Sequence, residues 1–115
     1  MIVVHIKRVY EKPSTSDGRR ILVDRLWPRG LSKEKARIDL WLKDIAPSAG
    51  LRKWFGHELA KWPEFQRRYQ EELEVNESAL AELCEVLRHE PVTLVFGAKD
   101  MEHNNAVVLK AYIER

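Results

Sequence analysis

The side chains best suited to chemistry in this sequence follow a short apolar segment, residues 21–23. They are Asp24, Arg25, Trp27 and Arg29. The continuous apolar start predicts a strand from Ile21 to Leu26 that is buried on both faces, as in a parallel sheet. Open parallel sheets bind their ligands at the carboxyl ends of the strands. We therefore expect two guanidinium groups and an indole to meet at a ligand site at this strand end.

A second group of polar side chains follows the clearest strand of the C-terminal half, Val92 to Phe96. This group consists of Asp100, His103 and Asn104. If the two strands are parallel neighbours, their carboxyl ends lie on one edge of the sheet and bring this group near Arg25 and Arg29. The last helix, with Asp100 as its expected N-cap, would add unpaired backbone N–H groups and a positive dipole. This arrangement predicts a site for an oxyanion such as a phosphate or carboxylate.

The charged loop also has a purely structural interpretation. Asp24 and Arg25 could form an internal ion pair in which Asp24 orients Arg25. Trp27 could fill the core under the loop, and Arg29 could simply be solvated. Both interpretations stay open at the level of the sequence.

Two histidines could add polar groups to the site. His103 is the best acid/base candidate, because the ordinary pKa of histidine is about 6.5. It could equally be a surface residue of a first helical turn. His57, which follows Trp54, Phe55 and Gly56, is a second possible ligand contact or a loop decoration. Asn105 lies one turn before apolar helical positions, so it is expected to face inward and to need hydrogen-bond partners.

Several kinds of catalytic site are excluded by their missing motifs. The sequence has no Gly-rich phosphate loop, no His-Glu-x-x-His and four scattered histidines without metal-ligand spacing. The single cysteine, Cys84, falls within a helical pattern, so no internal disulfide forms and a thiol nucleophile at the predicted site is disfavoured. We therefore expect no cofactor and no metal ion.

Composition favours a protein that stays in water and binds anions. Hydrophobic residues make up 44% and charged residues 33% of the 115 residues, and no apolar run is long enough for a membrane helix. The start of the chain lacks the features of a secretion signal, so we expect a cytoplasmic protein with no membrane contact. The net charge of +2 is uneven: residues 1–60 hold 13 Lys or Arg and 7 acids, whereas residues 61–115 hold 7 and 11. The four tryptophans among basic residues also allow single-stranded nucleic acid as a partner, although no recognised motif accompanies them.

The order of elements predicts an α/β fold in a single compact domain, residues 1–115, with a small, mostly parallel sheet flanked by helices. Strands are expected at residues 3–10, 21–26 and 92–96. Residues 38–45 fit both a strand and a helical stripe, and we favour the strand. Helices are expected after Ser32, after Ser48, from the region of Pro63 to Asn76, from there to His89, and at the C-terminus. Oligomeric state is not readable from the sequence.

Four segments resemble one known family. They are Val-Asp-Arg-Leu-Trp-Pro-Arg-Gly at 23–30, Trp-Leu-Lys-Asp-Ile-Ala-Pro-Ser at 41–48, Leu-Arg-Lys-Trp-Phe-Gly-His at 51–57, and Ala-Lys-Asp at 98–100 with His103 and Asn104. Together they are similar to the YeaO-like branch of the bacterial and archaeal domain-of-unknown-function 488 family. The resemblance implies a compact α/β fold and no established activity. It also implies that a Cys-x-x-Cys-His-Arg-like element, present after the corresponding strand of longer relatives, is replaced here by residues 97–104.

We therefore expect a binding protein or enzyme for a small phosphate- or carboxylate-bearing molecule. Arg25 and Arg29 would bind the anion, His103 would be the acid/base candidate, and four further residues would line the pocket: Trp27, His57, Asp100 and Asn104. The alternatives are a nucleic-acid-binding module and an interaction module whose charged cluster is purely structural.

Overall fold

The fold is built on an open parallel sheet. The computed structural model of the protein describes residues 4–115, and within them four strands lie in the order β1 (Val4–Arg8), β4 (Val92–Phe96), β2 (Arg19–Leu22) and β3 (Leu40–Trp41). All three strand pairs are parallel. The α/β class predicted from the sequence is confirmed, and so is the parallel pairing of the two strands whose ends carry the polar side chains.

β4 lies at the centre of the sheet and is buried along its whole length. Its side chains alternate between two cores, as strand geometry requires. Leu94 and Phe96 face the larger core, whereas Val95 joins a smaller one with Leu22 on the other face. An apolar strand covered on both faces is the pattern expected of a parallel sheet.

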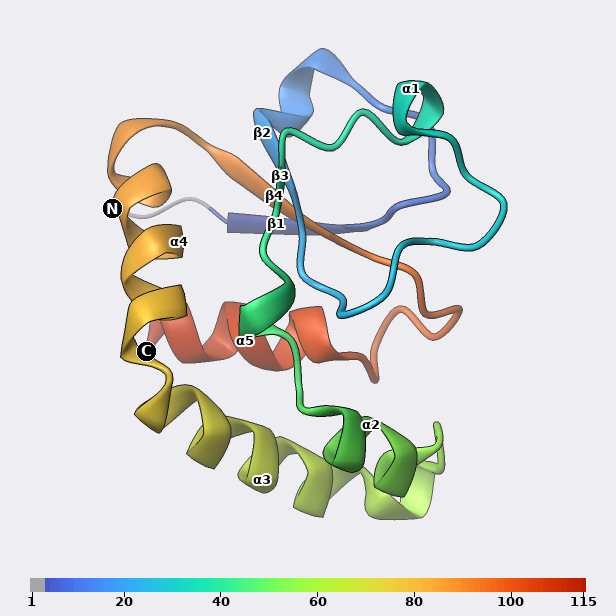
Figure 1. The fold of residues 1–115 in the computed structure, drawn as a ribbon, viewed down its shortest axis with the longest axis vertical. Coiled ribbons are helices and arrows are strands. Elements are labelled where there is room, and N and C mark those ends of the chain that lie inside the picture. Colours follow the sequence, from blue (N-terminus) through green and yellow to red (C-terminus); the bar gives the residue numbers. More distant parts are fainter. Residues whose placement is uncertain (1–3) are drawn as a thin grey trace.

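Helices cover one face of the sheet and loops with one short helix cover the other (Figure 1). The larger core contains residues from four helices: α2 (Ala49–Phe55), α3 (Trp62–Val75), α4 (Glu77–His89) and α5 (Asn105–Glu114). The smaller core lies under α1 (Lys33–Ala36) and the loop that follows β2. Short 3-10 turns occupy Thr15–Asp17, Lys43–Ile45 and Leu59–Lys61. Within residues 4–115, no helix is long and apolar enough to cross a bilayer.

Most helix starts lie where the capping residues in the sequence predicted them. Ser32 and Ser48 cap α1 and α2 through their side-chain oxygens, as predicted. Asn76 separates α3 from α4, and Pro63 lies in the first turn of α3, one residue after its first position. The prediction that Asp100 caps the last helix was wrong. Asn104 is the N-cap of α5, and Asp100 instead accepts hydrogen bonds from the backbone N–H groups of Glu102 and His103.

β2 starts and ends earlier than predicted, at Arg19–Leu22 instead of residues 21–26. The early start is possible because Arg20 is buried, with 3% of its surface exposed, and its guanidinium is paired with Asp17 and with the carbonyl of Ala36. Sequence patterns treat an arginine as exposed, whereas a paired guanidinium allows a strand to begin there.

The remaining strand boundaries also changed. The predicted strand at residues 38–45 is confirmed only over Leu40–Trp41, where β3 pairs with Ile21 and Leu22, and Lys43–Ile45 forms a 3-10 turn. The first strand is confirmed over Val4–Arg8 rather than 3–10, and residue 3 lies outside the described residues.

Candidate functional site

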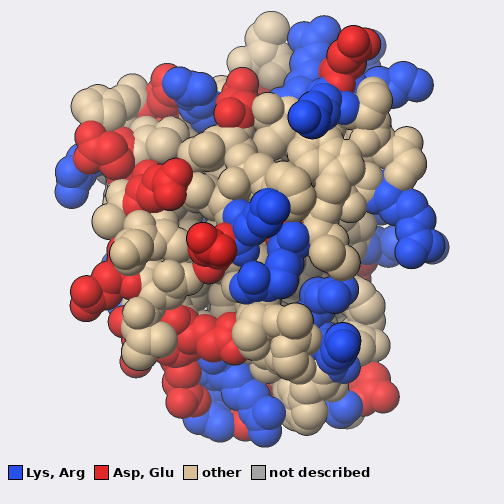
Figure 2. All heavy atoms as spheres, in the orientation of Figure 1, with Lys and Arg blue, Asp and Glu red and all other residues tan. Residues whose placement is uncertain are grey.

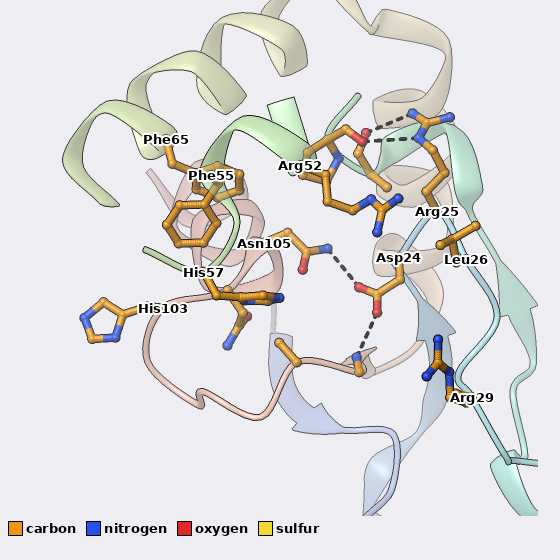
Figure 3. Close-up of a pocket in the computed structure, with 15 residues that line it drawn as sticks. Asp24, Arg25, Leu26, Arg29, Arg52, Phe55, His57, Phe65, His103 and Asn105 are labelled. Atoms are coloured by element: carbon orange, nitrogen blue, oxygen red, sulfur yellow. Dashed lines mark hydrogen bonds between the residues drawn. The ribbon is translucent and has the colours of Figure 1, made fainter. Parts of the chain in front are cut away.

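A pocket of about 440 Å³ opens at the carboxyl ends of β2 and β4. Four segments that are distant in sequence form it: the loop after β2, residues 46–57 around helix α2, Phe65 of α3, and residues 97–105 from the end of β4 to the start of α5 (Figure 3). Its position follows from the topology, because parallel strands end on the same edge and their connections diverge there.

The structure brings five of the residues singled out from the sequence to the lining of this pocket: Arg25, Arg29, His57, His103 and Asn104. Asp24 also lines it. Trp27 and Asp100 are not part of the lining. The cavity therefore lies at the predicted strand ends but with a different composition.

Asp24 connects three elements at the floor of the pocket. One carboxylate oxygen accepts a hydrogen bond of 2.8 Å from the backbone N–H of Gly97, and the other lies 3.1 Å from Nδ2 of Asn105. Burial raises the pKa of Asp24 above its ordinary value, although these hydrogen bonds and the charge of Arg52 act in the opposite direction. Asp24 thus joins the end of β2 to the end of β4 and to the start of α5.

Asp24 does not orient Arg25, so that prediction was wrong. The Arg25 guanidinium donates instead to the carbonyl oxygens of Pro47 and Ala46, at 3.2 Å and 3.4 Å. Arg25 therefore holds the segment before α2 and at the same time lines the pocket.

Arg52 and Arg29 place two more guanidinium groups at the pocket (Figure 3). Arg52 projects from α2 toward Asp24, and Arg29 lies on the other side of Asp24. Neither side chain donates a hydrogen bond to any residue within 4–115, and both residues are exposed. Figure 2 shows basic side chains gathered near the middle of this face, where Figure 1 places the end of β2. The described lining contains one carboxylate, Asp24, so the local charge is positive.

His103 occupies the opposite end of the pocket from Arg25 (Figure 3). Its Nδ1 lies 2.9 Å from a carboxylate oxygen of Asp100, and its ring meets the edge of Trp62 at 5.2 Å between centroids. The pKa of Asp100 is lowered by the backbone hydrogen bond from Glu102 and by its contacts with His103. Asp100 thus fixes the imidazole from outside the cavity.

Aromatic rings form the wall near the histidine end. Phe55 stacks on Phe65 at 4.4 Å, and the ring of His57 lies 6.0 Å from that of Phe55. His57 has a φ of 59°, in the left-handed region that β-carbon sterics disfavour. The exposed His57 ring is held beside a buried aromatic pair in a sparsely populated backbone conformation.

The tryptophans do not form an open stacking platform. Trp27 donates its indole N–H to the carbonyl of Leu31 and packs edge-on against Trp41 at 5.4 Å. Arg68 covers Trp54 at 4.2 Å, and Trp62 packs on Phe55 and Phe65. Because other side chains of the protein pack against these indole rings, the arrangement does not favour the stacking of nucleic-acid bases on them.

Sequence reasoning did not place Arg52, Phe55, Phe65 and Asn105 in the pocket, although it expected Asn105 to face inward. That expectation is confirmed, since Nδ2 of Asn105 donates to Val23 O at 2.9 Å and to Asp24. Arg52 and Phe55 are three residues apart on α2, a spacing that places side chains on the same helix face. Because the apolar face of α2 points inward, the spacing of Arg52 and Phe55 could have indicated from the sequence that Arg52 lies near the pocket.

The donor set of the pocket suits an anion better than a metal ion. Guanidinium groups donate hydrogen bonds and do not ligate metals. Among residues 4–115, no cluster of three or more His, Cys, Asp or Glu side chains is arranged to hold a metal ion.

Fold and pocket together define an α/β protein with an open parallel sheet and a basic pocket at the strand ends. The chain belongs to the domain-of-unknown-function 488 family: a family model described as "Inactive DUF488-N3 subclade" matches residues 3–115. This confirms the resemblance to the YeaO-like branch.

Two uncharacterised proteins are similar to nearly the whole chain. Rv3073c of Mycobacterium tuberculosis is 43% identical over 106 residues, which cover 92% of this chain and 89% of that protein. YeaO of Escherichia coli K12 is 41% identical over 110 residues, or 96% of each chain. A protein of Ruegeria named GTP cyclohydrolase FolE2 is 32% identical over 99 residues, which cover 84% of this chain and 24% of that protein. No solved structure matches the chain.

Proposed function

We propose that this protein binds a small anionic molecule, a phosphate or carboxylate compound, in the pocket at the ends of β2 and β4. The observation that carries the proposal is the convergence of Arg25, Arg29 and Arg52 on a cavity whose described lining has one carboxylate. That carboxylate already accepts two hydrogen bonds from the chain. The guanidinium groups therefore exceed what the protein itself neutralises.

The expected affinity is moderate. A hydrogen bond to a charged group contributes about 1.5–3 kcal/mol. Three such bonds correspond to dissociation constants from about millimolar to micromolar. Asn104 and the start of α5 add the positive end of a helix dipole to the same cavity.

Binding without turnover is the form of the proposal that the family description supports, since it calls the subclade inactive. The name of the Ruegeria relative, GTP cyclohydrolase, refers to a substrate that carries a triphosphate group. Inorganic triphosphate, which carries the charged groups of such a substrate, therefore belongs among the anions to be tested.

The test is calorimetric titration with inorganic phosphate, pyrophosphate, triphosphate and citrate at constant ionic strength. We expect saturable binding of at least one of these anions, weakened about tenfold or more in Arg52→Ala, which corresponds to about 1.4 kcal/mol. Arg88→Ala is the matched control, because Arg88 is an exposed arginine on α4 outside the pocket lining. If none of the four anions binds, or if both variants lose affinity equally, the proposal is wrong.

The contact between Asp100 and His103 favours a second candidate, an enzyme in which His103 transfers a proton to or from the bound molecule. A carboxylate on Nδ1 orients an imidazole and leaves Nε2 for the ligand. Phosphorus NMR of a bound phosphate compound separates the two candidates. Binding alone leaves the spectrum of the compound unchanged over time, whereas an enzyme would convert it and His103→Ala would stop the conversion.

A further inference from the structure

We propose that the ligand carries a hydroxyl group close to its anionic group, so that it is a hydroxylated phosphate or carboxylate compound. This inference rests on the proposed anion site and specifies what else the ligand presents there. A pocket of about 440 Å³ is within the range that holds whole small molecules and is much larger than a phosphate ion needs. The polar groups that line the pocket beside the arginines therefore select the rest of the ligand.

Asn105 presents a hydrogen-bond acceptor to the pocket that it lines. Both partners of its Nδ2, the carbonyl of Val23 and the carboxylate of Asp24, are acceptors, so the amide nitrogen must face them. Figure 3 shows the amide oxygen of Asn105 pointing away from Asp24. Within residues 4–115 that oxygen receives no hydrogen bond, and it is not sealed in the interior. A bound molecule can therefore donate a hydrogen bond to it.

This acceptor lies beside the proposed anion site. The Asn105 amide nitrogen is 3.1 Å from the Asp24 carboxylate, and Arg29 and Arg52 lie on the two sides of Asp24 (Figure 3). An anionic group bound by these two arginines therefore has the Asn105 oxygen close by. The donor that meets this oxygen should be separated from the anionic group by only a few bonds, as it is in a small hydroxy acid or a short polyol phosphate.

The charge of the pocket favours a neutral donor over an ammonium group. Three guanidinium groups and one carboxylate line the cavity, and that carboxylate already accepts hydrogen bonds from Gly97 and Asn105. An ammonium group would therefore meet net positive charge. A hydroxyl is neutral, and it can accept a hydrogen bond while it donates one. The exposed His57 lines the same pocket, and its ring carries an N–H donor in either tautomer, so a hydroxyl suits this mixture of donors and acceptors.

Isothermal titration calorimetry with two matched pairs tests the inference: racemic glycerol 3-phosphate against propyl phosphate, and racemic malate against succinate. We expect the hydroxylated member of at least one pair to bind about threefold or more tightly, as one added hydrogen bond provides. The pair that shows the preference identifies the anionic group. A smaller preference in both pairs would overturn the hydroxyl inference and leave anion binding intact.

Two further outcomes are informative. Phosphoethanolamine, which carries an ammonium group in place of the hydroxyls, should bind more weakly than glycerol 3-phosphate, and tighter binding would overturn the choice of a neutral donor. If none of these molecules binds, the hydroxyl inference is wrong, and the titration with phosphate, pyrophosphate, triphosphate and citrate decides separately whether the anion site exists.

Variants assign the preference to residues, and the readout is the ratio of affinities within a pair. Asn105→Ala removes the acceptor and should abolish the preference, whereas Arg52→Ala should weaken both members and keep it. An unchanged preference in Asn105→Ala that folds by circular dichroism would overturn the inference. If Asn105→Ala does not fold, His57→Gly takes its place, because a φ of 59° suits glycine and the backbone is retained. It should reduce the preference, and an unchanged ratio would again overturn the inference.

Discussion

Asn105 and Asp24 are 81 residues apart in the chain, yet the Asn105 amide donates a hydrogen bond of 3.1 Å to the Asp24 carboxylate. The other oxygen of the same carboxylate accepts from the backbone of Gly97. One half-buried acid therefore fixes the relative positions of two strand ends and a helix start. These hydrogen bonds hold together the segments that line one side of the pocket.

Replacing Asp24 by Asn tests this junction. An amide has one acceptor oxygen, so one of the two donors that Asp24 satisfies loses its partner, and we expect a loss of about 1–3 kcal/mol in the free energy of unfolding. Burial raises the pKa of Asp24 in the folded protein, so the folded state holds the proton more tightly than the unfolded chain. The wild type should therefore lose stability as pH rises from the ordinary value of 3.8 through the raised folded pKa.

Urea unfolding of both proteins across this pH range measures the effect. The stability difference between wild type and Asp24→Asn should shrink as pH rises, since only the wild type titrates at this position. A difference that grows with pH would mean that the pKa of Asp24 is lowered in the folded protein.

The stability contribution of Asp17 depends on pH in the opposite direction to that of Asp24. Burial by itself raises its pKa, but hydrogen bonds from Ser14, Lys7 and Arg20 hold the pKa below the ordinary value. Its stabilising contribution is therefore present at neutral pH and is lost as pH falls below 3.8 toward the lowered folded pKa. Asp17→Asn should cost about 3–5 kcal/mol at neutral pH, because it leaves the charge of the buried Arg20 without its partner.

Chemical denaturation at neutral pH is the measurement for Asp17→Asn. Glu85→Gln, which breaks exposed pairs on α4, serves as the control and should change stability by about 0.5 kcal/mol or less. Equal effects of the two substitutions would show that the buried pair adds nothing beyond a surface one.

Two glycines test how backbone conformation and the room for a β-carbon affect stability. Gly18 has a φ of +65°, and a β-carbon there would lie 2.4 Å from the carbonyl oxygen of Pro91. Gly18→Ala should therefore cost about 2 kcal/mol or more through strain and collision. Gly50 lies in α2 with open space around it, so Gly50→Ala should stabilise by about 0.5–1 kcal/mol. Thermal unfolding of the two variants should shift in opposite directions, and a tolerated Gly18→Ala would contradict the close approach to Pro91.

The pair of Asp100 and His103 makes a prediction about protonation geometry. A carboxylate only accepts hydrogen bonds, so Nδ1 of His103 must carry the hydrogen that faces Asp100. Nitrogen NMR above the titration range of histidine should show the Nδ1–H tautomer in the wild type. In Asp100→Ala the signal should shift toward the Nε2–H form, while that of His57 stays unchanged. An Nε2–H tautomer in the wild type would rule out the contact.

The sequence by itself determined the class of fold, the neighbouring strand ends and most helix starts. These features depend on local information. The apolar run at residues 92–96 specifies a buried strand, and serines 32 and 48 cap the helices that follow them because a side-chain oxygen satisfies a nearby backbone N–H. Arg25 and Arg29 were found because the sequence places them at the end of an apolar strand and in the loop that follows it.

Only the tertiary structure decided which side chains share the pocket. Arg52 reaches it because α2 lines the same pocket as the loop after β2, and Trp27 lies outside it because its indole donates to the carbonyl of Leu31 within its own loop. Arg20 can occupy a buried position in a strand because Asp17 neutralises its charge. Asp24 pairs with Gly97 and Asn105 and not with Arg25, because packing brings these two donors to it from a part of the chain that is far away in the sequence.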